Sequence, residues 1–311
     1  MNKEVTSLSC RRCASHAGSW YTDDPKHLKG QLSKWLATAV ESLGAAKNVV
    51  PVKAIIAPHA GYSYSGPTAA WAYGAIQNKN VKRIFVLGPS HHYYLQGCAL
   101  SDCASYDTPL GSLQVDQNIN AALRKEGTYT SFNTMSKSQD EEEHSIEMHL
   151  PYIAKIMEGC NRYTIVPILV GTLSASDELK YAGILQKYFD NPENLFIISS
   201  DFCHWGHRFS FQFHDERFSQ IYRSIEWLDH EGMTLIEKQD INGFRSYLKK
   251  YRNTICGRNP ICLLLQMMVN SELKLEAKFT HYAQSSQCIR VSDSSVSYAS
   301  CVISNISSSS P

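Results

Sequence analysis

Apolar residues along the chain follow two different spacings. In residues 26–43 they recur every three or four positions, which predicts an amphipathic helix. Uninterrupted apolar runs are typical instead of strands buried on both faces, and they lie at 52–58, 82–88, 163–171 and 194–200. Strands that alternate with helices predict an α/β fold, in which helices cover both faces of a mostly parallel or mixed sheet.

Proline, glycine and capping residues predict where other elements begin and end. Pro67 should open a helix, and Asp116 should cap one that Gly127 closes. Ser176 should start a helix that runs to Phe189. Further helices are expected over 144–158, with a kink at the internal proline, and over most of 214–270. Strands are expected over 273–283 and 296–303, as an antiparallel pair.

Composition excludes several classes of protein. The 311 residues include 30 Lys plus Arg and 29 Asp plus Glu, so the formal net charge is +1 and gives no basic footprint for nucleic acid. No run approaches the roughly 20 apolar residues of a spanning helix, and MNKEVTSLSC lacks the apolar core of a secretory signal. We expect a loose extension over 1–13, a single domain over 14–303 and a disordered serine-rich tail over 304–311.

The ten cysteines are irregularly spaced, unlike the disulfide framework of a small secreted domain. We therefore expect reduced thiols in a protein of the cytoplasm or nucleus. Cys10, Cys13 and His16 share a spacing similar to that of a zinc knuckle. They offer only three ligands where structural zinc takes four, so we interpret this spacing as coincidence.

Candidate chemistry gathers where three of the predicted strands end. Because ligands bind beyond the carboxyl ends of parallel strands, these side chains should converge on one pocket, where imidazoles and an acid can ligate a metal or transfer protons. The alternative is a set of solvated loop histidines. The three clusters are His59, Tyr62 and Tyr64; Ser90, His91 and His92; and Asp201, Cys203, His204, Trp205 and Arg208.

Two further segments leave alternatives open. In 140–152, His144 and Glu147 share one helix face and could border the pocket, or the acids from Asp140 to Glu143 could merely complement a helix dipole. Cys256 lies in a turn before a helix, where a thiol could be a ligand, a nucleophile or an inert side chain.

Long motifs resemble those of the Memo family, named for mediators of ErbB-driven cell motility. The resemblance covers about residues 13–303, in order and in spacing. Its motifs are ASHAGSWY (14–21), APHAGYSYSG (57–66), FVLGPSHH (85–92), TPLGSLQVD (108–116), DEEEHSIEMHLPY (140–152), SSDFCHWGHRF (199–209), NTICGR (253–258), YAQSSQC (282–288) and DSSVSYA (293–299).

The resemblance implies a fold similar to class III extradiol dioxygenases (the LigB-like fold), an α/β/α sandwich around a central sheet. It implies metal ligands at His59, His91 and Cys256, with the cysteine where those enzymes carry a glutamate. Asp201 and His204 match the pocket acid and the proton-transferring histidine. Other residues implied at the cleft are His16, Trp20, Tyr64, His144 and Arg208. Thiolate favours copper, zinc or thiolate-bound iron, and its ease of oxidation argues against ring cleavage.

For function, the resemblance implies a cytoplasmic effector of receptor tyrosine kinases, linked to Rho-type GTPases, the cytoskeleton, cell motility and control of oxidants. It also implies binding of phosphotyrosine-bearing receptor tails or adaptor proteins at the cleft. Three hypotheses follow: a signalling protein with redox-active copper or iron, a metal-dependent oxygenase or oxidoreductase, and a metal-free phosphopeptide-binding module. Sequence does not decide between His91 and His92 as the ligand.

Overall fold

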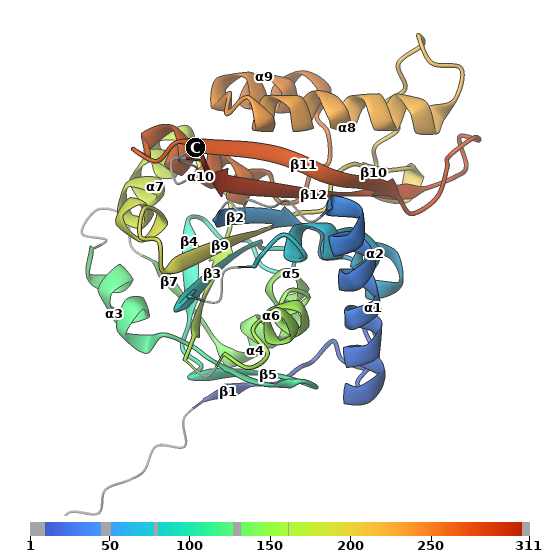
Figure 1. Cartoon of the computed structure of the whole chain (residues 1–311). Coiled ribbons are helices and arrows are strands. Elements are labelled where there is room, and N and C mark those ends of the chain that lie inside the picture. Colours follow the sequence, from blue (N-terminus) through green and yellow to red (C-terminus); the bar gives the residue numbers. More distant parts are fainter. Residues whose placement is uncertain (1–9, 45–50, 78–79, 127–131, 161, 307–311) are drawn as a thin grey trace, which may run out of the picture.

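The computed structural model describes residues 10–44, 51–77, 80–126, 132–160 and 162–306. Figure 1 shows helices packed on both sides of a curved sheet. The helices are α1 (Pro25–Leu43), α2 (Tyr62–Tyr73), α3 (Gln117–Glu126), α4 (Lys137–Glu142), α5 (His144–Glu147), α6 (Leu150–Ile156), α7 (Ala175–Phe189), α8 (Ile221–Glu237), α9 (Ile241–Tyr251) and α10 (Arg258–Asn270). The strands are β1 (Arg11–Arg12), β2 (Val52–Ala57), β3 (Arg83–Pro89), β4 (Cys98–Ser101), β5 (Ser105–Thr108), β6 (Gly111–Gln114), β7 (Asn133–Met135), β8 (Thr164–Val170), β9 (Asn194–Ser199), β10 (His204–Trp205), β11 (Leu275–Gln284) and β12 (Ser295–Asn305).

The main sheet is mixed. Its order is β10-β12-β2-β9-β3-β8-β4-β7, with β11 paired to β12, and a small second sheet has the order β1-β5-β6. The central strands β2, β9, β3 and β8 are parallel, whereas β12 is antiparallel to β2, β10 and β11. The predicted α/β class with a sheet covered by helices is confirmed, as is the antiparallel pairing of the last two long strands.

Alternate residues of the central strands pack into two separate cores. Ile56 and Phe85 face the core formed with α7, α8 and α10, whereas Ile55 and Ile84 face the core formed with α1, α2 and α6. Each strand is therefore buried on both faces, which explains the apolar runs in the sequence. The carboxyl ends of β2, β3 and β9 consequently share one edge, where the site lies.

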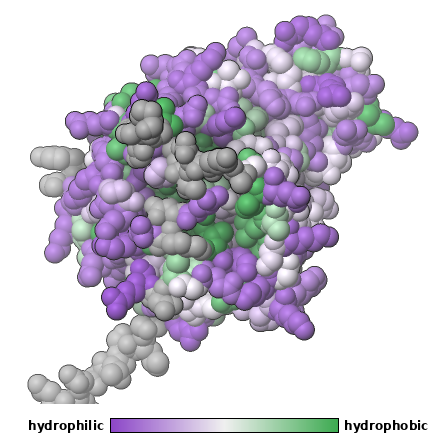
Figure 2. Space-filling view, viewed as in Figure 1, coloured by the Kyte–Doolittle hydropathy of each residue, from purple (hydrophilic) through white to green (hydrophobic). Residues whose placement is uncertain are grey.

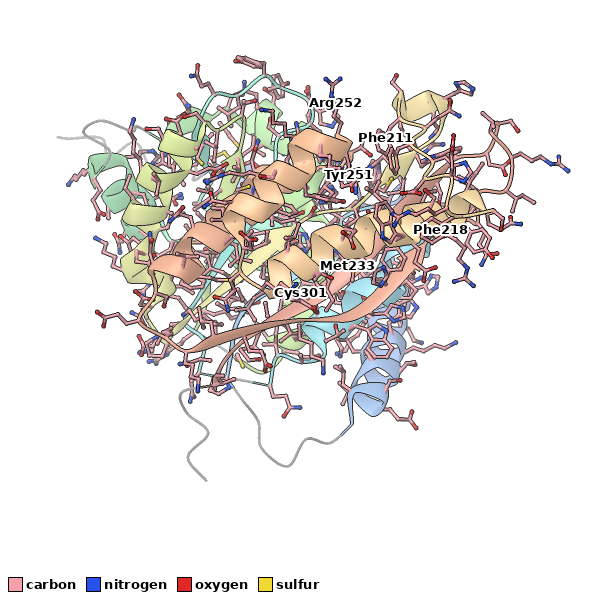
Figure 3. All side chains as sticks on the ribbon, turned by 90° about the horizontal axis from the view of Figure 1, so that it is seen from above. Phe211, Phe218, Met233, Tyr251, Arg252 and Cys301 are labelled. Atoms are coloured by element: carbon pink, nitrogen blue, oxygen red, sulfur yellow. A yellow bond between two sulfur atoms is a disulfide. The ribbon has the colours of Figure 1, made fainter. Side chains whose placement is uncertain are left out.

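Helices α8 and α9 pack against each other and α8 also packs on β11. Aromatic side chains join this layer to the segment that follows β10. The Phe218 and Trp227 rings lie 5.9 Å apart, and those of Trp227 and Tyr251 lie 5.7 Å apart. Figure 3 shows Phe218 and Tyr251 around the ends of these helices. The contacts hold the chain from His204 to Phe218 against the domain.

Helix α2 begins earlier than predicted. The structure starts it at Tyr62 and carries it through Pro67, which is exposed. Proline removes one hydrogen-bond donor from a helix interior. The start is fixed instead by tertiary contacts, because the Tyr62 amide donates to the Trp20 carbonyl at 2.9 Å and the Tyr62 hydroxyl donates to the Met148 carbonyl at 2.8 Å.

Other helix boundaries also differ. Ser174, rather than Ser176, caps α7 through a capping box with Asp177. The helix expected over 144–158 is two helices, since Pro151 cannot donate a hydrogen bond to Glu147 and the chain turns at Met148 and His149. The stretch 214–270 holds three helices, and Gly127 lies outside the described residues.

The ends of the domain extend beyond the predicted limits. The loose extension expected over 1–13 is wrong at its last residues, because Arg11–Arg12 form β1 and Arg12 is fully buried. Ser304 and Asn305 belong to β12, so they are not part of a disordered tail. The expectation of ten reduced thiols is also wrong, since Cys10 and Cys103 form a disulfide that joins the chain before β1 to the chain after β4.

The surface is mainly polar on the face drawn in Figure 2, where hydrophobic residues form several small patches, one of them near the centre. None of the helices within the described ranges combines the length and hydropathy that crossing a bilayer requires.

Replacing Cys10 or Cys103 by serine should lower the free energy of unfolding by about 2–4 kcal/mol in protein purified without reductant, because the disulfide closes a loop across 93 residues. Urea unfolding with and without dithiothreitol measures this loss, and reductant should affect wild type but neither variant. A thiol titration of the denatured wild type that found ten reactive sulfurs would contradict the pairing.

His149 should make the fold acid-sensitive. It is fully buried beside the Tyr73 hydroxyl, and burial lowers the pKa of His149 to about 3. Below pH 6.5 the imidazole therefore binds a proton in the unfolded chain but stays neutral in the folded chain. The free energy of unfolding should fall by about 1.4 kcal/mol per pH unit as the pH drops from 6.5 toward 3. In His149→Gln this slope should decrease by that amount in urea unfolding between pH 6.5 and 4.5. An unaltered slope in His149→Gln would disprove the assignment.

Candidate metal centre

His59 follows β2 and is held in one orientation and one tautomer. Its Nδ1 lies 2.6 Å from the Ser199 hydroxyl, whose proton is already donated to the Ser145 carbonyl at 2.7 Å. Nδ1 must therefore carry the imidazole proton, which leaves the Nε2 lone pair facing the cleft. Burial, with the neighbouring charge of His91, lowers the pKa of His59 well below its ordinary value, so the ring is neutral.

His91 follows β3 and is oriented by a buried carboxylate. Its backbone amide donates to Glu143 Oε2 at 2.7 Å, and its Nδ1 lies 2.9 Å from Glu143 Oε1. Burial raises the pKa of Glu143, but hydrogen bonds and charge from His91 outweigh burial and hold that pKa at about 2. An ionised Glu143 accepts the Nδ1 proton, so Nε2 is the ring nitrogen of His91 left to bind a ligand.

Cys256 lies just before α10 and reaches the same place. Its Sγ lies 3.2 Å from His59 Nε2 and accepts the Asp201 amide at 3.2 Å. Burial and the Asp201 carboxylate raise the pKa of the Cys256 thiol, so the sulfur is protonated and can donate to His59. Gly257 lets the turn approach β9, because a side-chain carbon there would lie 2.3 Å from Ser200 Cβ.

These three residues bring their ligand atoms within 4.8 Å of one another. The structure therefore places His91, rather than His92, with His59 and Cys256. A cavity of about 230 Å³ opens beside them, lined in part by His91, Cys256, Tyr93 and Arg258. Two imidazoles oriented through Nδ1 and one thiol that can lose its proton suit a soft or borderline transition metal.

His144 stacks on His91, with ring centroids 4.4 Å apart, and lies 5.4 Å from the His59 ring. Burial and the charge of His91 lower the pKa of His144 to about 3. Its Nδ1 is buried without a hydrogen-bond partner among the described residues. A second group with ligand spacing combines His91, Glu143 and His144. His144 thus lies at the pocket wall, one of the two roles left open by its sequence.

The first turn of the domain forms the next part of the wall. The Trp20 ring lies 4.3 Å from His144 and 5.7 Å from His16. His16 Nδ1 lies 2.8 Å from Glu147 Oε2, and Tyr21 donates to the other oxygen of Glu147 at 2.8 Å. Both His16 and Trp20 are half-buried.

Asp201 and His204 lie at the opposite side, after β9. Asp201 Oδ1 accepts the His59 amide at 2.8 Å, and burial raises the pKa of Asp201. His204 Nδ1 lies 2.9 Å from the Phe202 carbonyl and 3.1 Å from the Thr254 carbonyl, which leaves Nε2 as its free acceptor. Thr254 and Cys256 lie in the same loop, so this loop positions both the His204 imidazole and the Cys256 thiol.

The remaining predicted pocket residues divide into two groups. Tyr64, which is 61% exposed, and the exposed Arg208 both interact electrostatically with the buried Tyr298, and neither lines the cavity beside Cys256. Three members of the strand-end clusters point into the interior instead: Tyr62, Cys203 and Trp205. Side chains alternate between the two faces of a sheet only within a strand, so sequence alone does not show which residues of the following loop face the pocket.

Sequence reasoning missed the residues that orient the site. The acids Asp140, Glu143 and Glu147 are all buried. Asp140 lies in the first turn of α4 and Glu143 caps α5, as the helix-dipole interpretation expected, but both also bond to distant side chains. Arg12 pairs with two of these acids: its guanidinium bonds to Asp140 Oδ1 at 3.1 Å and to Glu147 Oε2 at 2.6 Å. It also donates to the carbonyls of Asp140 and Glu143. The one signal available was the density of acids next to histidine in 140–149.

The fold and site define a class of protein: an α/β domain with a His/Cys cleft at the carboxyl ends of parallel strands. The chain belongs to the Memo-like protein family, whose sequence profile matches residues 12–302. Protein MEMO1 of Danio rerio is 52% identical over 298 residues, covering 94% of this chain and 96% of that protein. Protein MEMO1 of Homo sapiens is 51% identical over 294 residues, covering 93% of this chain and 96% of that protein. Protein memo-1 homolog of Caenorhabditis elegans is 49% identical over 297 residues, covering 94% of this chain and 82% of that protein. An uncharacterized protein of Escherichia coli K12 aligns in structure with a TM-score of 0.45 at 11% identity, covering 78% of this chain and 98% of that one, too distant to support an argument.

Replacing Arg12 by methionine should destabilise the domain by about 3–5 kcal/mol, since Asp140 and Glu147 would remain buried without a cation. Urea unfolding measures the loss. Arg11→Met is the matched control, because Arg11 pairs with Asp107 at the surface and its loss should cost far less than the loss of Arg12. Equal effects of the two variants would contradict this role for Arg12.

Proposed function

We propose that this protein is a cytoplasmic signalling effector that holds a redox-active copper or iron ion through His59, His91 and Cys256. The supporting observation is the spacing of the three ligand atoms, all within 4.8 Å, together with the fixed tautomer of each imidazole. Zinc would also suit the same donors. The ion would displace the thiol proton of Cys256, so binding should release a proton and weaken as pH falls.

The donor set favours redox binding over ring cleavage. A bound ion of this kind supplies one-electron chemistry and Lewis acidity. Cys256 is itself oxidisable, so activation of dioxygen beside it would damage a ligand. Around the ion, Ser199 and Glu143 would hold the two imidazoles, and Trp20 with His144 would exclude water from one side. His204 Nε2 and Asp201 are the groups available to hold or move a proton.

Signalling is the second part of the proposal. Membership of the Memo-like family supports a link from receptor tyrosine kinases to Rho-type GTPases, the cytoskeleton, cell motility and oxidant control. Phosphotyrosine-bearing receptor tails or adaptor proteins would bind at the cleft, where Arg208 offers a guanidinium to phosphate and Trp20 and Tyr64 offer aromatic faces. The exposure of Tyr64 and Arg208 also favours a second candidate, the metal-free phosphopeptide-binding module.

Metal analysis of protein purified without a histidine tag tests the centre. We expect about one equivalent of copper or iron, reduced at least tenfold in His59→Ala and in Cys256→Ser. His92→Ala is the matched control, since His92 is adjacent in sequence but outside the ligand group, and it should retain the metal. Metal-free wild type that still binds a phosphotyrosine peptide would favour the second candidate.

Oxygen consumption with a panel of catechols separates the signalling protein from an oxygenase. The metal-loaded protein should show no turnover. Turnover that disappears in His204→Ala, while metal content stays constant, would instead support a metal-dependent oxygenase.

A further inference from the structure

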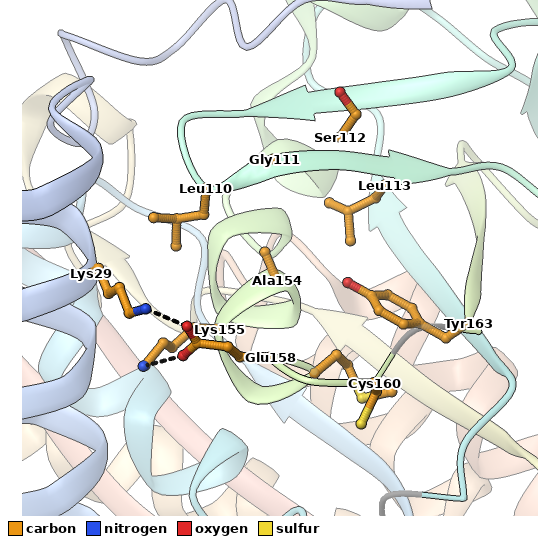
Figure 4. Close-up of a pocket in the computed structure, with 11 residues that line it drawn as sticks. Lys29, Leu110, Gly111, Ser112, Leu113, Ala154, Lys155, Glu158, Cys160 and Tyr163 are labelled. Atoms are coloured by element: carbon orange, nitrogen blue, oxygen red, sulfur yellow. Dashed lines mark hydrogen bonds and ion pairs between the residues drawn. The ribbon is translucent and has the colours of Figure 1, made fainter.

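A second cavity lies between α1, the end of α6 and the hairpin of β5 and β6 (Figure 4). Its volume is about 250 Å³, and it shares no lining residue with the cavity beside Cys256. Ligand pockets usually measure about 300–1,000 Å³, so only a small molecule would fill it. The surrounding side chains differ at its two ends.

One end carries two ammonium groups and one carboxylate. Lys155 Nζ lies 2.8 Å from Glu158 Oε2, and Lys29 Nζ pairs with the other oxygen of Glu158. Figure 4 shows both lysines converging on this one carboxylate. This end therefore has a local charge of +1. Each ammonium has three donors, of which Glu158 uses one, so both lysines can accept a further anion.

The other end carries the Tyr163 hydroxyl, which Figure 4 shows pointing into the cavity. It has no hydrogen-bond partner among the described residues, and Tyr163 is half-buried. Burial raises the pKa of Tyr163 to about 12, so at neutral pH the phenol is a neutral donor. A ligand group placed there should be a hydrogen-bond acceptor.

The walls between the two ends are apolar. Leu113 and Met157 are almost fully buried, at 3% and 2% exposure, and Leu110 with Ala154 completes the lining. Such walls favour a flat or aliphatic body over a second charged group, because burying an unpaired charge is costly.

We propose that this cavity binds a small amphipathic carboxylate. Its anionic group would contact Lys29 and Lys155, its apolar body would lie on Leu113 and Met157, and an acceptor at its far end would receive the Tyr163 hydroxyl. Glu158 is the competitor already present in the fold, since it holds the same two ammonium groups. Removing the Glu158 charge should therefore strengthen binding, whereas a purely structural ion pair would give no such gain.

Calorimetric titration with 4-methoxybenzoate tests the proposal, with 4-methoxybenzamide as the uncharged probe of the same shape. Wild type should bind the acid at least tenfold more tightly than the amide. The double variant Lys29→Met, Lys155→Met should lose at least tenfold in affinity, Tyr163→Phe should lose severalfold, and Glu158→Gln should gain severalfold. Lys34→Met, an exposed lysine of α1 outside the lining, should match wild type.

The same titration in Cys256→Ser excludes binding at the metal centre, and its affinity should equal that of wild type. Urea unfolding of each variant verifies the fold. Equal affinity for acid and amide, a loss of affinity in Glu158→Gln, or dependence on Cys256 would each overturn the proposal.

Discussion

The buried guanidinium of Arg12 is the interaction on which the geometry of the cleft depends. It bonds to the carboxylates of Asp140 and Glu147 and to the backbone carbonyls of Asp140 and Glu143. One cation therefore contacts the chain at several points from α4 to α5. Glu147 can then remain ionised in the interior, where it receives His16 and Tyr21. Because a buried carboxylate without a cation is costly, β1 must stay docked for this wall of the cleft to exist.

The second constraint is that two of the imidazoles, His59 and His144, are neutral. Burial lowers the pKa of both His59 and His144, so the cleft does not accumulate positive charge from its own rings. With its Nδ1 protonated, the neutral His59 ring directs the Nε2 lone pair, rather than a proton, toward Cys256. Electrostatics and hydrogen bonding thus favour a cation at this point, where several protonated imidazoles would have repelled one.

The sequence predicted the fold class and the convergence of His59, His91 and Cys256. It did not predict the residues that hold these side chains and the surrounding wall in place. Apolar runs reveal strands buried on both faces, and parallel strands bring their carboxyl ends to one edge, whereas Cys256 could be assigned only through family motifs. Ser199 and Arg12 escaped detection because their partners are 140 and about 130 residues away, and no local pattern marks a side chain as a long-range partner. Helix α2 began early for the same reason, since Tyr62 is held by contacts with Trp20 and Met148.

The acids around the cleft already have partners in the fold, which favours sulfur as the anionic ligand of the proposed metal ion. Glu143 accepts the ring and amide of His91 and the amide of Ser145, which occupies both of its oxygens. Glu147 is occupied by Arg12, Tyr21 and His16. Asp201 accepts the amides at the start of the loop after β2. Each carboxylate therefore stabilises the scaffold, and moving one onto an ion would leave buried donors unsatisfied. Cys256 accepts backbone amides, and its thiol proton can be donated to His59 Nε2 or to the Asp201 carbonyl, so it is the group that could exchange a proton for a metal at least cost to the fold.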